Sequence, residues 1–402
     1  MVKFSRGGVT APSGFLAAGI HCGIKPSPLL DLAVIASEVA GPIAGVFTTN
    51  RFPAAPVIVD RLHLRHKTGR AVIINSGNAN AFTGAQGLAD AKEMAQLTAD
   101  FLGCPHYQVY VGSTGVICPR LPMPCIREHL PRLMARLRKG GHREAATAIL
   151  TTDTKVKEVA IVTKLQGTTI TVGGMAKGAG MIHPNMATML AFLTTDAMLH
   201  QPALQQALSQ AVERSFHCIS VDGETSTNDT VLCLANGSAG TAILDPRSPD
   251  MARFQQALNE ACLALALQIV DDGEGATKRV EFRITGAQTT SEAKCIAKTL
   301  ATSPLIKTAL FGEDPNWGRI IAAVGRAGPR VRSEDFALAF DDVIVVHPGM
   351  KITPDAERRV RRIMQKKRFT IQVTVGRGSA AATIWTTDLS YDYVRINASY
   401  RS

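Results

Sequence analysis

The 402-residue sequence has no apolar run long enough to cross a membrane, and it is poor in aromatic side chains. A spanning helix needs about 20 consecutive apolar residues, so we expect no membrane-spanning segment. Tryptophan occurs only twice and aromatic residues make up 5% of the chain, which argues against a surface built to stack nucleic-acid bases. The N-terminal segment lacks the apolar core of a secretory signal, so a cytoplasmic location is expected.

The eight cysteines are dispersed without a single C-x-x-C pair. A structural zinc site needs clustered thiolates, and a disulfide-stabilised scaffold needs an oxidising compartment. The ten histidines are equally scattered and form no HxxxH pair. We therefore expect reduced, mostly buried cysteines, such as Cys262 in ACLALALQIV, and no metal site.

Two common catalytic signatures are also missing, the GxxxxGK[ST] phosphate loop and the GxSxG nucleophile elbow. Residues 376–381, GRGSAA, do match the GxGxxA pattern of dinucleotide-binding folds. That site requires a helix to begin at the glycines, so that its amides meet a pyrophosphate. The residues that follow, ATIWTTDL, are rich in the β-branched types favoured in strands. We interpret 376–381 as a hairpin turn.

The chain carries a formal charge of +11, from 44 Lys and Arg against 33 Asp and Glu. This excess lies in two stretches, residues 127–143 with a net +5 and residues 357–368 with a net +6. One interpretation is an electrostatic footprint for nucleic acid or another acidic partner. The other is a pair of solvated helix faces, because apolar residues recur at helical spacing in both stretches. We favour the helical interpretation, which predicts no binding of nucleic acid.

Strand-like and helix-like segments alternate along the chain, which predicts a mixed α/β fold. A helix is expected over 90–102, with Met94, Thr98 and Phe101 facing inward and Gly103 at its end. Four glycines in 173–180 indicate irregular backbone. This stretch is also the one place where composition weakly suggests a boundary between two parts of the chain. The other expected elements are a buried strand at 71–74, a hairpin of 158–164 with 168–172, helices 202–212 and 251–270, and strands 369–375 and 381–389.

The segment 173–193, GGMAKGAGMIHPNMATMLAFL, is the part of the chain most suggestive of chemistry. Glycines permit backbone conformations in which exposed amides surround an anion, and Lys177 lies among them. A threonine hydroxyl is a poor nucleophile unless a base lies within hydrogen-bond reach. Cleavage before Thr188 would supply that base, because the new α-amine has a pKa much nearer neutral than a lysine amine. From these residues alone, a structural threonine is the simpler interpretation.

Longer motifs occur in a fixed order along the chain. They are GVFTTN, NSGNANAFTG, STGVI, TTDT, GGMAKGAGMIHPNMATMLAFLTTDA, DGETSTNDT, DGEGATK, FGEDPNWGR and YDYVRINASYRS. In these motifs, from Gly8 to Ser402, the chain resembles the bifunctional glutamate N-acetyltransferase/ornithine acetyltransferase family of arginine biosynthesis. The resemblance implies stacked sheets flanked by helices, in an ornithine acetyltransferase/aminopeptidase-like self-processing fold. It also implies autoproteolysis between Ala187 and Thr188, giving an α chain, 1–187, and a β chain, 188–402.

The resemblance assigns roles to individual residues of this sequence. Thr188 would be the nucleophile, and Thr114 and Gly115 of STGVI would form the oxyanion hole. We expect Lys177 to hold the α-carboxylate that both amino-acid substrates share, and Glu274 to pair with a substrate ammonium. The complete set of implied substrate contacts is Thr151, Lys177, Thr188, Glu274, Asn397 and Ser402.

The implied reaction is a ping-pong transfer of the acetyl group from N2-acetylornithine to glutamate through acetylated Thr188. It yields ornithine and N-acetylglutamate and requires no metal or organic cofactor. Some members of the family also accept acetyl-CoA, which makes it a candidate co-substrate. The expected assembly is a heterotetramer of two α and two β chains. Its expected partners are small-molecule substrates, with neither nucleic acid nor membrane.

Four residues depart from the pattern usual in the family. His183, Cys118, Val156 and Ser402 stand where Ala, Gly, Pro and Thr are more frequent. None of them is the nucleophile or an oxyanion residue, so the predicted activity stands. Two alternatives stay open: a hydrolase, in which water resolves the acyl-enzyme, and a nucleic-acid-binding protein, suggested only by the charge.

Overall fold

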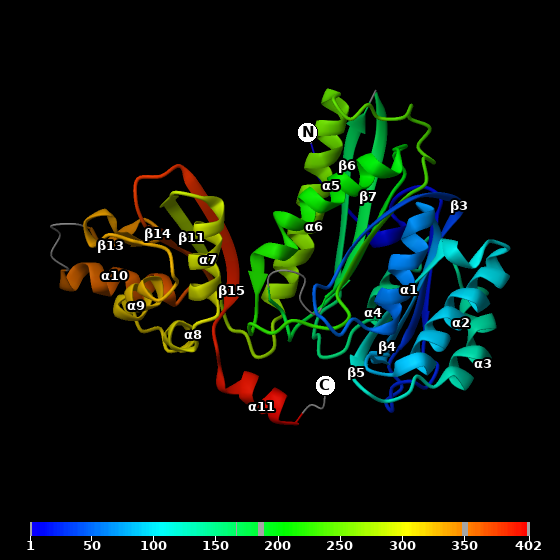
Figure 1. The fold of residues 1–402 in the computed structure, drawn as a ribbon, viewed down its shortest axis with the longest axis horizontal. Helices are drawn as coiled ribbons and strands as arrows, with labels where there is room; N and C mark the ends of the chain where they lie inside the picture. Colours follow the sequence, from blue (N-terminus) through cyan, green and yellow to red (C-terminus); the bar gives the residue numbers. More distant parts are fainter. Residues whose placement is uncertain (1, 166, 184–188, 348–352, 400–402) are drawn as a thin grey trace.

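The computed structural model describes residues 2–165, 167–183, 189–347 and 353–399. Figure 1 shows two lobes, with the C-terminal helix α11 (Tyr391–Ser399) returning from the smaller lobe toward the larger one. The larger lobe contains β1 to β8, β10 and α1 to α6, and the smaller one contains β9, β11 to β15 and α7 to α10. The mixed α/β class predicted from the sequence is confirmed.

The sheets of the larger lobe are joined by one long strand, β3. This strand pairs with β2 and β4 near its start and with β10 near its end, and its register shifts between Ala36 and Gly41. Strand β3 thus takes part in two sheets that are continuous through it, one with β2, β4 and β5 and one with β10, β8, β7, β6 and β1. The strands are β1 (Lys3–Ser5), β2 (Phe15–Ile20), β3 (Leu32–Phe47), β4 (Thr68–Asn78), β5 (Val109–Val116), β6 (Lys157–Leu165), β7 (Thr168–Lys177), β8 (Leu190–Thr195) and β10 (Thr230–Ala235).

Alternation of side chains along β4 shows how these two sheets stack. Val72 and Ile74 belong to a core shared with Phe192 of the second sheet, whereas Ala71 and Ile73 pack with α2 and α3. Successive strand residues point to opposite faces, so the first sheet has helices on one face and the second sheet on the other. The helices of this lobe are α1 (Ala55–His63), α2 (Gly84–Leu102), α3 (Met123–Met134), α4 (His142–Ala148), α5 (Gln201–Glu213) and α6 (Pro249–Asp271).

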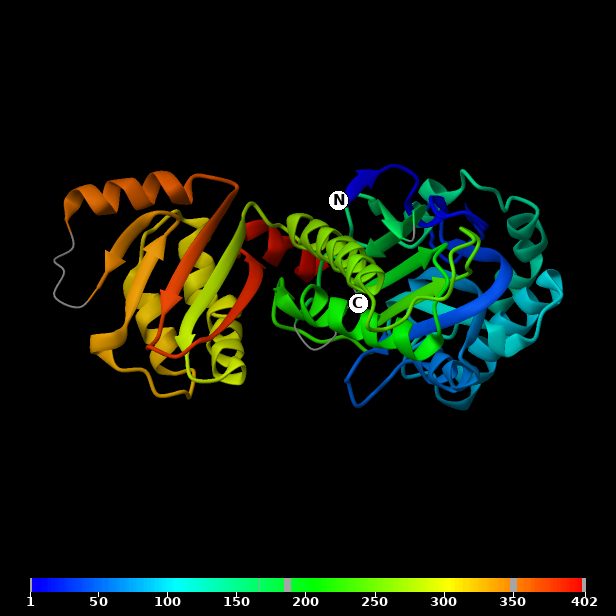
Figure 2. The ribbon, with the colours of Figure 1, turned by 90° about the horizontal axis from the view of Figure 1, so that it is seen from above.

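The outer face of the second sheet is covered by α5 and α6, whose apolar residues share one core with β6, β7, β8 and β10. Helix α6 starts at a proline, and the hydroxyl of Ser248 before it accepts a hydrogen bond from the backbone N–H of Met251, which is a typical N-terminal cap. Figures 1 and 2 show the resulting order of helices, sheet, sheet and helices. The predicted stacked sheets flanked by helices are therefore confirmed.

The smaller lobe is a six-stranded sheet in the order β13-β12-β14-β11-β15-β9, covered by helices that share its apolar core. The strands are β9 (Ile219–Ser220), β11 (Arg279–Ala287), β12 (Ala337–Phe340), β13 (Val343–Val346), β14 (Arg368–Thr374) and β15 (Ala380–Thr387), and the helices are α7 (Thr290–Ala301), α8 (Pro304–Phe311), α9 (Trp317–Gly325) and α10 (Pro354–Met364). Because β11 lies between β14 and β15, residues 376–381 do not form the expected hairpin turn. They lead into strand β15 rather than a helix, so they also lack the helix that a dinucleotide site requires.

The glycine-rich segment is more regular than expected. Strand β7 continues through Gly173 and Gly174 to Lys177 and pairs with β6 on one side and β8 on the other. A Cβ atom at Gly173 would lie 2.2 Å from the carbonyl oxygen of Gly8. The glycine therefore makes room for neighbouring backbone. The weak boundary that composition suggests at 173–180 is wrong, because β7 lies inside a sheet. The predicted α chain, 1–187, and β chain, 188–402, would arise by cleavage of one peptide bond, and they stay a prediction. Strands from both ranges lie in the same sheet.

The other expected elements are mostly confirmed. The strand at 71–74, the hairpin around Gly167, and the helices at 202–212 and 251–270 are all present, extended by a few residues. Helix α2 begins at Gly84 rather than at residue 90, and Gly103 ends it with a φ of 62°. Met94 and Thr98 are buried as predicted, but Phe101 is 52% exposed because its ring, in the last turn, faces solvent.

Both basic stretches have the character of solvated helix faces. Arg and Lys side chains of α3 and α10 are exposed, whereas their apolar residues, such as Leu130 and Val360, are buried. Several of the cations pair with surface carboxylates, including Arg127 with Glu93, and α10 makes similar pairs. No helix among the described residues is long and apolar enough to cross a membrane. The eight cysteines are free, and Cys262 is buried as expected. The expectation that most of them are buried is wrong, because only Cys22, Cys233 and Cys262 are, and Cys118 and Cys295 are exposed.

Candidate active site

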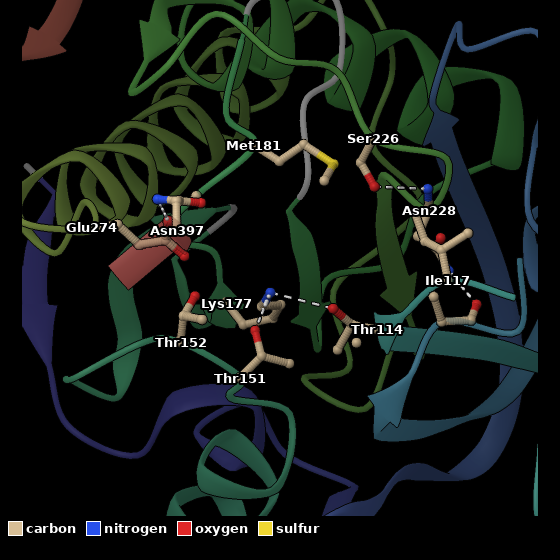
Figure 3. A pocket seen from close by; sticks show the side chains of 13 residues that line it. Thr114, Ile117, Thr151, Thr152, Lys177, Met181, Ser226, Asn228, Glu274 and Asn397 are labelled. Carbon is tan, nitrogen blue, oxygen red and sulfur yellow. Dashed lines mark hydrogen bonds between the residues drawn. The ribbon is translucent and has the colours of Figure 1, made fainter. Parts of the chain in front are cut away.

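A cavity in the larger lobe lies where β5 and β7 end, and Figure 3 shows the side chains around it. Six of the residues predicted from the motifs line this cavity: Thr114, Gly115, Thr151, Lys177, Glu274 and Asn397. They come from segments far apart in the sequence, so the fold brings them together. The predicted cleavage site, Ala187 and Thr188, and the predicted contact Ser402 lie outside the described residues.

The predicted oxyanion pair lies at the end of strand β5. This strand runs parallel to β4, with Gly115 opposite Gly77. Gly115 has a φ of 133°, and a Cβ atom there would lie 2.3 Å from the carbonyl carbon of Gly77. Only glycine fits such a close approach of two backbones. Thr114 and Gly115 therefore lie side by side near the end of β5, in the cavity wall.

Lys177 connects the oxyanion threonine with the TTDT loop, residues 151–154. Its Nζ donates to the Oγ1 of Thr151 at 2.9 Å and to the Oγ1 of Thr114 at 3.3 Å, as Figure 3 shows. The side chain is 3% exposed, and burial lowers the pKa of the Lys177 ammonium, an effect that the nearby Asp153 carboxylate opposes. A buried cation therefore lies directly beside the group expected to meet an oxyanion.

Asp153, from the same TTDT motif, is a site residue that the sequence reasoning missed. Its Oδ1 accepts hydrogen bonds from Lys157 Nζ and from the backbone N–H of Gly178, both at 2.6 Å. Burial alone would raise the pKa of Asp153, but the ammonium groups of Lys177 and Lys157 and the hydrogen bonds outweigh it and hold the pKa at about 2. This carboxylate is therefore ionised and lies behind the wall of the cavity.

A second buried carboxylate, Asp272, anchors the TTDT loop to the end of helix α6. Its Oδ2 accepts from Lys157 Nζ at 2.6 Å and from the backbone N–H of Thr154 at 3.0 Å. Lys157 is 1% exposed and contacts both Asp153 and Asp272. Because a buried charge is costly unless it is paired, Lys157 and these two carboxylates stabilise one another and fix the loop.

Glu274 follows α6 and reaches the cavity beside Gly180. A Cβ atom on Gly180 would lie 2.4 Å from the Glu274 carboxylate, so this glycine leaves room for the acid. The Nδ2 of Asn397, on α11, donates to Glu274 Oε2 at 2.9 Å (Figure 3). The two residues predicted to contact substrate are thus paired with each other at one side of the cavity.

Two residues of the DGETSTNDT motif, Ser226 and Asn228, line the cavity, and the buried Asp229 follows them in the chain. Asn228 donates through Nδ2 to the carbonyls of Ala79 at 2.6 Å and Ser113 at 2.8 Å, and the hydroxyl of Ser226 accepts from the N–H of Asn228 (Figure 3). Asp229 Oδ1 accepts from the backbone N–H of Met189 at 3.0 Å, and burial raises its pKa well above the usual value. The motif is recognisable in the sequence, but no local pattern predicts these long-range contacts.

The charges of the cavity suit a small zwitterionic ligand. Lys177 supplies a cation, Glu274 supplies a carboxylate, and Thr114, Thr151 and Asn397 supply neutral polar groups. Within the described ranges, no group of three or more His, Cys, Asp or Glu side chains is arranged to hold a metal ion. The arrangement can bind an amino acid and stabilise negative charge on a carbonyl oxygen beside Thr114.

The profile of the ArgJ family matches residues 16–402. The chain belongs to the ArgJ family. A relative from Geobacter sulfurreducens is 47% identical over 389 residues, covering 97% of this chain and 99% of its own. A relative from Chlorobaculum tepidum is 48% identical over 394 residues, covering 97% and 96%. Both are named arginine biosynthesis bifunctional protein ArgJ.

A solved structure adds a comparison at the level of the fold. The crystal structure of arginine biosynthesis bifunctional protein argJ from Bacillus halodurans is 42% identical, with a TM-score of 0.50. It is matched over 98% of its own chain and covers 52% of the chain described here. Together with the family match, this confirms the family predicted from the sequence motifs, and with it the expectation of an arginine-biosynthesis enzyme of the acetyltransferase class.

Proposed function

We propose that this member of the ArgJ family transfers the acetyl group of N2-acetyl-L-ornithine to L-glutamate, giving L-ornithine and N-acetyl-L-glutamate. The observation that carries the proposal is the single cavity lined by six residues that the sequence motifs single out, with a buried ammonium against the Thr114 hydroxyl. Family membership supports it, because relatives nearly half identical over the whole chain are named for arginine biosynthesis.

The proposal includes self-cleavage between Ala187 and Thr188, with Thr188 as the new N-terminal nucleophile. The flanking described residues favour this location: Met181 lines the cavity, and Leu190, two residues after Thr188, pairs with Lys177 in the sheet. A homologous solved chain that is matched over 98% of its length yet covers 52% of this one has the length expected of the β chain, residues 188–402.

In the proposed cycle the Thr188 hydroxyl attacks the acetyl carbonyl while the Thr188 α-amine takes its proton. The hydroxyl of Thr114 and the backbone of Gly115 stabilise the oxyanion of the tetrahedral intermediate. That intermediate collapses as the α-amino group of ornithine receives the proton and leaves, so Thr188 carries an acetyl ester. The α-amine of glutamate then attacks the ester carbonyl and loses a proton to the Thr188 amine. The bond between the acetyl carbon and Thr188 Oγ breaks, Oγ takes that proton back, and N-acetylglutamate departs from the regenerated enzyme.

The residues around the cavity support the substrate roles in this cycle. Lys177 is the buried cation nearest the oxyanion threonine and serves a substrate α-carboxylate, and Glu274 with Asn397 serves a substrate ammonium. Acetyl-CoA would form the same acetyl-enzyme, and we propose it as a second donor. No metal or organic cofactor takes part in the cycle. We also propose a heterotetramer of two α and two β chains in the cytoplasm, where its free cysteines stay reduced.

The experiment that tests the proposal is an intact-mass measurement on the wild type and Thr188→Ala, combined with labelled acetyl transfer. The wild type should give two fragments that meet between residues 187 and 188, and Thr188→Ala should give one uncut chain. Wild-type enzyme with labelled N2-acetylornithine should pass the label to glutamate. Release of the label as acetate would instead indicate a hydrolase, and a wild type that stays uncut would remove the nucleophile from the proposal.

A further inference from the structure

The Asp153 carboxylate lies at the centre of the polar contacts behind the cavity wall. Its Oδ1 accepts from Lys157 and Gly178, its Oδ2 accepts from the backbone N–H of Thr151 at 3.1 Å, and Oδ2 lies 3.9 Å from Lys177 Nζ. The side chain is fully buried. It is not among the residues that line the cavity, so it does not itself meet a substrate.

We propose that Asp153 is a positioning residue for acetyl transfer, which keeps the Lys177 ammonium against the Thr114 hydroxyl and so aims that hydroxyl into the cavity. The inference rests on the proposed function, because it concerns how the oxyanion donor is prepared. Its structural basis is the set of three segments that Asp153 joins: the TTDT loop through Thr151, the end of β7 through Lys177, and the loop that follows through Gly178.

The argument starts from the hydrogen-bonding capacity of a hydroxyl. Thr114 Oγ1 has one proton to donate and two lone pairs that accept. When Lys177 occupies one lone pair, the Thr114 proton must point away from the ammonium, and Thr114 is itself one of the residues that line the cavity. A hydroxyl that accepts from a cation is also a stronger donor, because its own O–H bond is further polarised. Lys177 therefore prepares Thr114 to donate to an oxyanion.

Lys177 needs Asp153 to stay in that position. A lysine side chain is flexible and strongly hydrated, and here its ammonium has exchanged water for two hydroxyls that carry no charge. Asp153 is the carboxylate that lies nearest to it and is the largest influence opposing the loss of its proton. An uncharged side chain at 153 would leave the Lys177 ammonium both less confined and easier to deprotonate.

The charges around Lys177 allow the effect to be isolated. The other titratable groups that influence it are Lys25, Lys157, Glu274 and Asp229. Lys157 acts in the opposite sense to Asp153, because it is a cation that lowers the pKa of Lys177. Removing Asp153 and removing Lys157 should therefore move the titration of Lys177 in opposite directions, which a purely structural role for the loop does not predict.

The test compares Asp153→Asn, Lys157→Gln and Asp196→Asn in the self-processed enzyme. Asp196 is a matched control, because it is a buried carboxylate that accepts from the backbone N–H groups of Ser13 and Thr171 at the other end of β7 and β8. Rates of acetyl transfer from N2-acetylornithine to glutamate are measured across pH at saturating substrates, with thermal unfolding to verify the fold.

We expect Asp153→Asn to lower kcat about 10- to 100-fold, since a misaligned oxyanion donor costs much of its effect. We also expect the alkaline limb of the kcat–pH profile to move to lower pH in Asp153→Asn and to higher pH in Lys157→Gln. Asp196→Asn should keep the wild-type profile. If Asp153→Asn does not fold, the profile of Lys157→Gln tests the inference instead. A shift of its alkaline limb to higher pH supports the inference, and an alkaline limb at the wild-type position overturns it.

Failure of the inference and failure of the proposed function give different results. A wild type that transfers no acetyl group contradicts the proposed function. An active wild type with Asp153→Asn indistinguishable from Asp196→Asn overturns the role of Asp153 alone, and leaves the acetyl transfer intact.

Discussion

The Thr114 hydroxyl is the part of the site whose contribution can be isolated most cleanly, because valine has nearly the same shape without the hydroxyl. The side chain is buried and its Oγ1 accepts from Lys177. We predict that Thr114→Val lowers kcat for acetyl transfer about 10²- to 10³-fold, the usual effect of losing one oxyanion donor. The measurement is steady-state kinetics with both substrates varied.

A matched control for this substitution is Thr98→Val in helix α2. The Thr98 hydroxyl is also buried and donates to the carbonyl of Met94 within the same helix. Thr98→Val should leave kcat unchanged and affect only the free energy of unfolding. If Thr114→Val keeps kcat within about threefold of the wild type, the hydroxyl is not an oxyanion donor and Gly115 and other groups must replace it.

At the scale of single residues, the ordered motifs predict more of the site than the chemistry of the individual residues does. Thr114, Thr151, Lys177 and Glu274 are predictable because they stand in long ordered motifs, and they line one cavity. Asp153 stands in one of the same motifs but was missed, since its role depends on contacts with Lys157 and Gly178 that the fold creates. A buried carboxylate looks the same in a sequence as an exposed one.

At the scale of elements, the end of strand β5 depends on glycine at position 115. A methyl group there would overlap the backbone of Gly77 and Asn78 on β4 at 2.3–2.5 Å, and the φ of 133° is unfavourable for other residues. We predict that Gly115→Ala lowers the free energy of unfolding by about 2–4 kcal/mol, from strain and overpacking together. Chemical denaturation measures it, and activity should fall as β5 separates from β4.

The control is Gly140→Ala, a turn glycine with nothing within 4 Å of the added methyl group. Its effect should stay within about 0.5 kcal/mol, as for ordinary surface substitutions. Equal stability of Gly115→Ala and Gly140→Ala would show that the β4–β5 contact tolerates a side chain.

Local patterns predicted individual elements well and their pairing poorly. The hairpin of β6 and β7 was predicted correctly, because its two strands and its turn are adjacent in the sequence. The same local criteria predict a second hairpin turn at 376–381, but strand β11, about ninety residues earlier, inserts between β14 and β15. Likewise the glycines of β7 suggest irregular backbone when the sequence is considered alone, whereas Gly173 accommodates the backbone of Gly8, which is far away in the sequence.

At the scale of the whole molecule, the net charge of +11 lies on the surface and the charges that matter for the site are buried. The basic helix faces of α3 and α10 are exposed and partly paired with surface acids. The site instead depends on a small set of enclosed groups, Lys177, Lys157, Asp153 and Asp272, whose formal charges cancel. Salt should therefore affect substrate encounter more than the chemical step, because buried pairs are screened much less.

One more buried cation connects the smaller lobe to the cavity. Lys307 of α8 is 3% exposed and donates to the Oγ1 of Thr387, at the end of β15, at 3.0 Å. Thr387 in turn donates to the carbonyl of Val221, next to Asp222, which accepts from the backbone N–H groups of Met181 and Ile182 at the cavity. Burial lowers the pKa of Lys307 to about 7, although Asp388 and Asp222 oppose this.

This lowered pKa predicts how stability depends on pH. In the unfolded chain Lys307 would titrate near its ordinary value of about 10.4, so between pH 7 and 10 the unfolded state binds more protons than the folded state. Stability contributed by this group therefore rises with pH across that window. We predict that the melting temperature of Lys307→Met, relative to the wild type, is highest at or below pH 7 and falls steadily toward pH 10. Differential scanning fluorimetry across this range measures it, and a difference independent of pH would mean that Lys307 is not held with a lowered pKa at the junction of the lobes.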